Sequence, residues 1–146
     1  KGIAGGLPFG GVRANEKCRD VFTPGTHGTT FGGNPVSAAA ACYVLDRIDD
    51  ALLEQVKEKG AYIRQKVEEM DLPCLGKTLG LGLMIGVEVK GEKTNRELAA
   101  ALIDNGLLCL TAGAGLRFLP PLVITQEEMD EALTILQRTL SPFKGV

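Results

Sequence analysis

Glycine is unevenly spread along this chain of 146 residues, and its distribution limits where a packed core can form. Nine of the 19 glycines fall in residues 1–33, where apolar residues lack periodicity and Pro8 and Pro24 interrupt any regular element. Ordering such a backbone costs about 1–2 kcal/mol of entropy per residue, and few apolar side chains offset that cost. We therefore expect a loop segment there, ordered by contact with another chain or another part of a protein, with Phe22 and Phe31 at that contact.

Helical periodicity begins directly after this segment. Apolar residues recur at the 3.6-residue period over residues 35–48 and again over residues 49–70, with charged residues between them. Two capping boxes, at residues 94–97 and 125–128, open two further helices that end near Gly106 and Leu140. Four helices are therefore predicted.

Strand periodicity appears between these helices. Residues 80–89 alternate between apolar side chains and glycine or polar ones, which predicts one strand with Leu83, Ile85 and Val87 buried. Two shorter strands are expected at residues 107–110 and 116–119. The order of elements predicts an α+β fold with about three mainly antiparallel strands covered by helices.

Composition excludes several classes of function. The net charge of −2 provides no basic face for nucleic acid, and no apolar run reaches the roughly 20 residues needed to cross a membrane. The four cysteines lack metal-binding spacing and the chain has one histidine, so we expect reduced thiols and no metal site.

The loop at residues 26–35, Thr-His-Gly-Thr-Thr-Phe-Gly-Gly-Asn-Pro, can contact a phosphate group. Its glycines leave backbone N–H groups accessible, and Thr29 and Thr30 add hydroxyls. Asn34 is a favourable N-cap and Pro35 suits the first position of the following helix, whose dipole favours an anion. A glycine-rich turn before a helix, with no ligand, is the simpler alternative.

A second glycine-rich run, Lys1-Gly2-Ile3-Ala4-Gly5-Gly6-Leu7-Pro8, precedes this loop. Together the two runs resemble the class III aminotransferases that use pyridoxal 5'-phosphate, in the acetylornithine and ornithine branch. The resemblance covers only the C-terminal part of that family's length. It implies the small C-terminal domain of a fold type I transferase at residues 35–146, with residues 1–34 belonging to an absent large domain.

The resemblance also assigns residues to roles. Lys1 matches the catalytic lysine that carries the cofactor, and Thr30 matches the threonine that binds the cofactor phosphate across the dimer, with Thr29 as a weaker candidate. His27 is expected only to shape the loop. Arg117 matches an arginine near the substrate carboxylate, a role that suits a guanidinium because it binds carboxylates with two hydrogen bonds; a structural ion pair is the alternative. Many relatives carry Arg-Gly where this chain has Thr78-Leu79.

The other cofactor-binding groups of the family lie upstream of the lysine, so the chain is interpreted as an inactive fragment. The parent enzyme is expected to be a cytoplasmic homodimer of arginine biosynthesis that moves an amino group from N-acetylornithine to 2-oxoglutarate. The alternatives are an ornithine, 4-aminobutyrate or succinylornithine aminotransferase, or a non-catalytic binding or dimerisation module.

Overall fold

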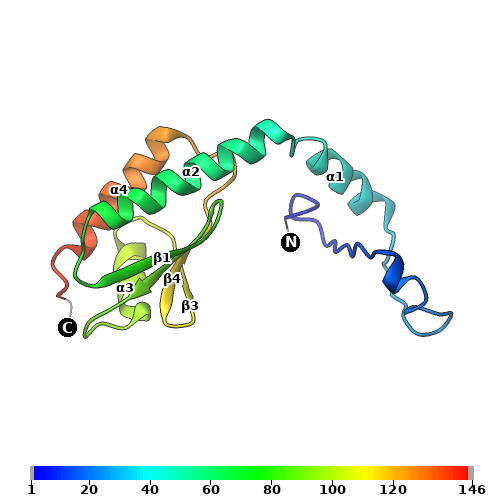
Figure 1. Cartoon of the computed structure of the whole chain (residues 1–146), viewed down its shortest axis with the longest axis horizontal. Coiled ribbons are helices and arrows are strands. Elements are labelled where there is room, and N and C mark those ends of the chain that lie inside the picture. The colour runs from blue at the N-terminus through cyan, green and yellow to red at the C-terminus, as the bar shows by residue number, and fades with distance from the viewer. Residues whose placement is uncertain (1, 145–146) are drawn as a thin grey trace. The chain divides into compact units, whose positions relative to one another are not determined.

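The computed structural model describes residues 2–144 (Figure 1). Contacts divide the chain into two units, residues 1–50 and 51–146. The elements, in chain order, are the short 3-10 helix η1 (Glu16–Cys18), α1 (Pro35–Leu45), α2 (Asp50–Glu69), β1 (Leu75–Leu81), β2 (Met84–Val89), α3 (Asn95–Asp104), β3 (Leu110–Ala112), β4 (Gly115–Phe118) and α4 (Gln126–Leu140). Helix α1 groups with the glycine-rich segment in these contacts, and the domain division after residue 34 stays a prediction about the whole enzyme.

The second unit contains an antiparallel sheet of four strands in the order β1-β2-β4-β3. The mixed architecture confirms the α+β prediction, but the single strand expected at residues 80–89 is wrong. Leu81 pairs with Met84, so the chain reverses through a turn of two residues, Gly82 and Leu83. Gly82 has φ +53°, and glycine at the first position of such a turn matches the right-handed twist of a hairpin.

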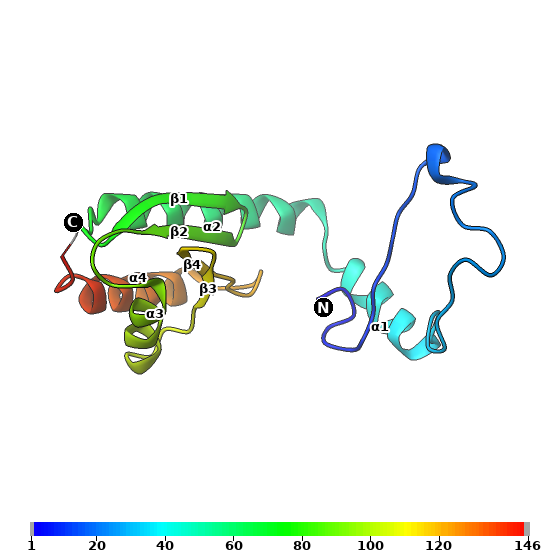
Figure 2. The same cartoon turned by 90° about the horizontal axis from the view of Figure 1, so that it is seen from below.

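The core lies on one face of this sheet. Leu83, Ile85 and Val87 are 4%, 0% and 2% exposed, which confirms the predicted buried row. They pack with residues of three helices, among them Val67 of α2, Leu102 of α3 and others of α4. Figures 1 and 2 show α2 running along the length of β1 and β2. Leu81 is 85% exposed because its partner Met84 shares its face, and that face is opposite to the core.

Local signals fixed the helix ends. Both capping boxes form at the N-termini of α3 and α4, and Asn34 caps α1 with Pro35 at its start. The first helix is shorter than its periodicity suggested, since it ends at Leu45. No helix in residues 2–144 is long and apolar enough to span a membrane.

A close backbone contact places α2 on the β1–β2 hairpin. A Cβ atom at Gly60 would lie 2.0 Å from the carbonyl oxygen of Gly82, so only glycine allows this approach. The same oxygen accepts a hydrogen bond from Arg64 Nη1 at 3.1 Å. The helix and the hairpin turn therefore meet backbone to backbone, and this contact supports the edge of the sheet.

Candidate functional site

The loop before α1 is built from short-range hydrogen bonds within the first unit. The amide of Gly32 donates to the carbonyl of Thr29 (3.4 Å), and the amide of Asn34 donates to that of Phe31 (3.2 Å). A Cβ at Gly32 would meet the Thr29 methyl at 2.3 Å, so a larger residue there would force the exposed Thr29 side chain to move. Gly33 has φ +73°, a conformation that side-chain-bearing residues rarely adopt.

The N-terminus of α1 is already capped. Asn34 Oδ1 accepts hydrogen bonds from the amides of Val36 (3.0 Å) and Ser37 (3.2 Å), and Pro35 has no amide hydrogen. An anion beside this helix therefore has to be bound chiefly by the preceding loop and by the helix dipole.

Thr29 and Thr30 are exposed, and neither hydroxyl has a hydrogen-bond partner in the described part of the chain. Phe31, the next residue, is 82% exposed, and Phe22 is 66% exposed. The Phe22 ring contacts the ring of His27 at 5.8 Å between centroids, in a tilted arrangement that agrees with a shaping role for His27. Residues 21–31 thus carry free hydroxyls next to uncovered aromatic rings, which supports a contact with something outside the described residues.

Arg117 lies on the face of the sheet opposite to the core. Its strand β4 places Leu116 in the core and Arg117 outward, because successive side chains of a strand point to opposite faces. Arg117 pairs with Gly86 on one side and with Leu110 on the other. It is exposed, and its guanidinium has no ion pair or hydrogen bond with any residue from 2 to 144. The alternative of a structural ion pair within the described chain is therefore not observed.

A hollow of about 540 Å³ surrounds Arg117 on this open face. Exposed apolar side chains border it, Leu79 and Met84, and the glycine at Gly86 leaves the space between the strands open. Lys77 and Glu88 also line the hollow, so Arg117 shares it with a second cation and one carboxylate. A guanidinium on such a mainly apolar, concave surface can hold a small carboxylate through two hydrogen bonds. The Thr78-Leu79 pair lies next to this hollow. The Thr78 hydroxyl donates a hydrogen bond to Glu68 of α2, and Leu79 presents an apolar side chain to the hollow.

The predicted site residues fall in different parts of the structure. Thr29 and Thr30 belong to the first unit and Arg117 to the second, and each unit is described by itself. Lys1, the residue on which the chemistry depends, lies outside the described residues. The structure therefore shows the local setting of three predicted residues, each within its own unit.

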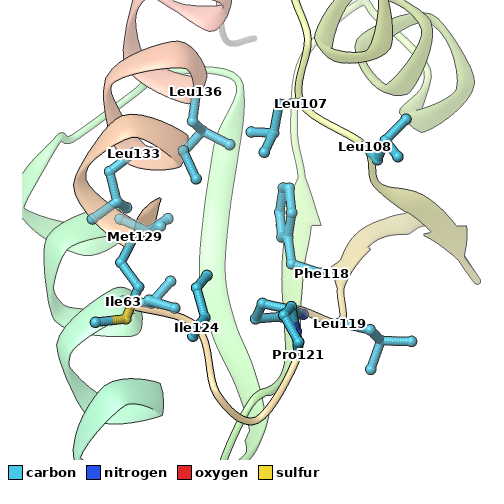
Figure 3. Close-up of a pocket in the computed structure, with 13 residues that line it drawn as sticks. Ile63, Leu107, Leu108, Phe118, Leu119, Pro121, Ile124, Met129, Leu133 and Leu136 are labelled. Carbon is cyan, nitrogen blue, oxygen red and sulfur yellow. The ribbon is translucent and has the colours of Figure 1, made fainter. Parts of the chain in front are cut away.

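The sequence did not reveal a second hollow, of about 340 Å³, on the helical side of the sheet (Figure 3). Its walls are almost entirely carbon: Ile63 of α2, Phe118 of β4, the Leu119–Ile124 connection, and Met129, Leu133 and Leu136 of α4. Its lining provides no charged group, so it has no means of orienting a polar substrate. The signal that could have found it is the apolar run that continues past β4.

Burial makes two of the four thiols poorly reactive, and the described residues contain no metal-binding cluster. Burial raises the pKa of both Cys74 and Cys109, which keeps these thiols protonated and poorly nucleophilic. All four cysteines are free thiols. Residues 2–144 contain no group of three or more His, Cys, Asp or Glu side chains that could hold a metal ion.

Comparison with known proteins gives one consistent result. The family model for class III aminotransferases matches residues 1–140. Acetylornithine aminotransferase of Aquifex aeolicus is 43% identical over 96% of this chain, and ornithine aminotransferase of Staphylococcus carnosus is 43% identical over 97%. The crystal structure of acetylornithine aminotransferase from Elizabethkingia anophelis, 34% identical, covers 89% of the chain with a TM-score of 0.77. In each case the chain spans only 36% of the other protein's length.

Proposed function

We propose, since the chain belongs to the class III aminotransferase family, that it is the C-terminal part of an enzyme that moves an amino group from an ω-amino donor to 2-oxoglutarate. The observation that carries this proposal is the match of nearly the whole chain to that family. N-acetylornithine is the proposed donor. Relatives named for acetylornithine and for ornithine share the same 43% identity with the chain, so ornithine remains the second candidate.

Pyridoxal 5'-phosphate would supply the electron sink that makes amino transfer possible. The residues present fit part of its site, because the loop before α1 offers two hydroxyls on a glycine-containing turn that have no partner in residues 2–144. Thr30 is proposed to donate its hydroxyl hydrogen bond to the cofactor phosphate, with Thr29 as the weaker candidate. In a homodimer, Thr30 would serve the site of the partner subunit, and the exposed rings of Phe22 and Phe31 would be covered there.

Lys1 is proposed to hold the cofactor and to act as the general acid and base. Its Nζ would take a proton from the substrate carbon that bears the amino group and deliver it two atoms away, in a 1,3-transfer. A lysine can do this near neutral pH only if its surroundings lower its pKa by burial or by nearby positive charge. Such surroundings would have to come from the rest of the enzyme, a cytoplasmic homodimer in this proposal.

Arg117 is proposed to bind a substrate carboxylate. Its exposure, the absence of an ion pair with any acidic side chain in residues 2–144 and the mainly apolar hollow beside it support this role. A guanidinium can hold a carboxylate through two parallel hydrogen bonds, which fixes the direction of the substrate as well as its position. The same group could pair with an acidic side chain of the absent domain when no substrate is bound.

The first experiment uses the chain of 146 residues. Mixed with pyridoxal 5'-phosphate, N-acetylornithine and 2-oxoglutarate, it should produce glutamate no faster than the free cofactor does, because the remaining cofactor-binding groups are missing. Turnover clearly above that rate would refute the proposed inactivity. Reading the gene upstream of the Lys1 codon would show whether a large domain is encoded there; an absent domain would favour the non-catalytic module.

The second experiment uses the whole enzyme encoded by an extended reading frame. Arg117→Gln should raise the KM of the carboxylate substrates by at least about tenfold, the effect expected for a lost contact with a charged group. Arg138→Gln is the matched control, since Arg138 is an exposed arginine on α4, which packs on the other face of the sheet. Equal KM values for both variants and for the unmodified enzyme would refute the role of Arg117.

A further inference from the structure

The turn between β3 and β4 is held by a side chain from another element. Asn95, the first residue of α3, donates from Nδ2 to the carbonyl oxygens of Gly113 (2.9 Å) and Gly115 (3.0 Å). A side-chain amide has two N–H donors, so it can satisfy both oxygens at once. The two carbonyls belong to the residues on either side of Ala114, so Asn95 holds the turn closed. We call these two hydrogen bonds the Asn95 clasp.

Asn95 is itself firmly placed by the capping box around it. The Glu97 carboxylate accepts hydrogen bonds from the Thr94 amide (2.8 Å) and hydroxyl (2.9 Å), and the Thr94 hydroxyl accepts one from the Glu97 amide (3.3 Å). Lys93 Nζ lies 2.7 Å from the same carboxylate. These contacts fix the first turn of α3, so the Asn95 amide starts from a defined position.

The turn that Asn95 holds leads directly into the strand that carries Arg117. Strand β3 has three residues and, within residues 2–144, pairs with β4 alone, with Leu110 opposite Arg117 and Ala112 opposite Gly115. So short an edge strand has few ladder hydrogen bonds of its own. A shift of one residue in its pairing would turn every side chain to the other face.

Close packing at Gly115 allows only glycine at this position of the strand pairing, so a shift in register would cause a clash. A Cβ at Gly115 would lie 2.5 Å from the carbonyl oxygen of Val87, so the start of β4 approaches β2 backbone to backbone. Arg117 is two residues further along, beside Gly86. Any movement of the turn is therefore passed along a short and tightly packed stretch of strand to the guanidinium.

We propose that Asn95 is a positioning residue for Arg117. It pins the β3–β4 turn to α3, and the pinned turn keeps the guanidinium directed into the hollow on the open face of the sheet. This inference rests on the proposed role of Arg117 in binding a substrate carboxylate. It adds a specific requirement, that a residue without substrate contact sets the affinity for that carboxylate.

The first test measures amide hydrogen exchange in the chain of 146 residues. Asn95→Ala and Asn95→Asp should speed exchange of the β3 and β4 amides by about tenfold, while core amides of α4 change less. Asn105→Ala is the matched control, because Asn105 Nδ2 makes a similar bond of 2.9 Å to the Ala101 carbonyl at the other end of α3. Equal acceleration in α4 and in the hairpin would show a general loss of stability and overturn the proposal.

The second test measures steady-state kinetics in the whole enzyme. Asn95→Asp, which keeps the shape but loses the donors, should raise the KM of carboxylate substrates by about tenfold and leave kcat within about twofold. Asn105→Ala should change neither constant. In an Arg117→Gln background, Asn95→Asp should cause no further rise in KM, since the group that it positions is already gone.

The outcomes separate the two proposals. If Arg117→Gln leaves KM unchanged, the role of Arg117 fails, and its positioning by Asn95 fails with it. If Arg117→Gln raises KM and Asn95→Asp does not, the role of Arg117 stands and the inference about Asn95 is overturned. Hydrogen exchange reports on the clasp in both cases, because it does not depend on activity.

Discussion

Replacing Gly60 by alanine would improve the helix propensity of α2 but would disrupt its close contact with the Gly82 carbonyl. Gly60 lies inside the 20-residue helix α2, where alanine is intrinsically favoured over glycine by about 1 kcal/mol. The new Cβ would lie 2.0 Å from the oxygen and 2.5 Å from the carbon of the Gly82 carbonyl. Both are backbone atoms, so no side chain can rotate away, and α2 or the hairpin must move by about 1 Å to reach even the shortest normal contact.

The expected result is a net loss of stability. Overpacking of this kind costs about 1–3 kcal/mol. The displaced carbonyl also accepts the hydrogen bond from Arg64, and weakening that bond adds about 1 kcal/mol. After the helical preference is subtracted, Gly60→Ala should lower the free energy of unfolding by about 1–3 kcal/mol.

Urea unfolding followed by Tyr62 fluorescence measures this change. The chain has no tryptophan and two tyrosines, so a Tyr43→Phe background leaves a probe in the second unit alone. Ala61→Gly, at the neighbouring exposed position, calibrates the helical preference and should cost about 1 kcal/mol. If Gly60→Ala stabilises by as much as Ala61→Gly destabilises, the close contact with the hairpin does not decide the outcome, and the reasoning is refuted.

Three further predictions concern stability. Thr139→Val should raise the free energy of unfolding by about 1 kcal/mol, because the buried Thr139 hydroxyl has no partner in the described residues. Thr134→Val is the control, since the exposed Thr134 hydroxyl donates a hydrogen bond to the Asp130 carbonyl at 2.8 Å. Equal effects of the two variants in urea unfolding would contradict the argument. Ile85→Ala should cost about 2–5 kcal/mol in the same assay, and a loss below about 1 kcal/mol would disprove its full burial. The Lys93 ammonium and the Thr94 cap lower the pKa of Glu97 from 4.5, its value in the unfolded chain, to about 2. The stabilising effect of the Glu97 carboxylate is therefore complete above pH 4.5 and is lost as the pH falls toward 2. Glu97→Gln should flatten the dependence of stability on pH in this range, and identical profiles for the variant and the unmodified chain would exclude the effect.

The sequence by itself determined the features that depend on neighbouring residues. Both capping boxes and the Asn34 cap formed as predicted, because a cap is decided within about four residues. Alternation identified Leu83, Ile85 and Val87 as core. Alternation within β4 likewise puts Arg117 outside the core, on the face opposite to Leu116. The roles of Lys1, Thr29 and Thr30 remain predictions.

Tertiary structure decided the features that depend on residues far apart in the chain. An unbroken alternation at residues 80–89 hid a hairpin, since a two-residue turn pairs Leu81 with Met84 and sends both to the open face. The approach of Gly60 to Gly82 and the clasp of Asn95 on Gly113 and Gly115 join residues 18 or more positions apart, and no short pattern encodes them. Backbone pairing and close packing place these groups, because they become neighbours only after the sheet and its helices have assembled.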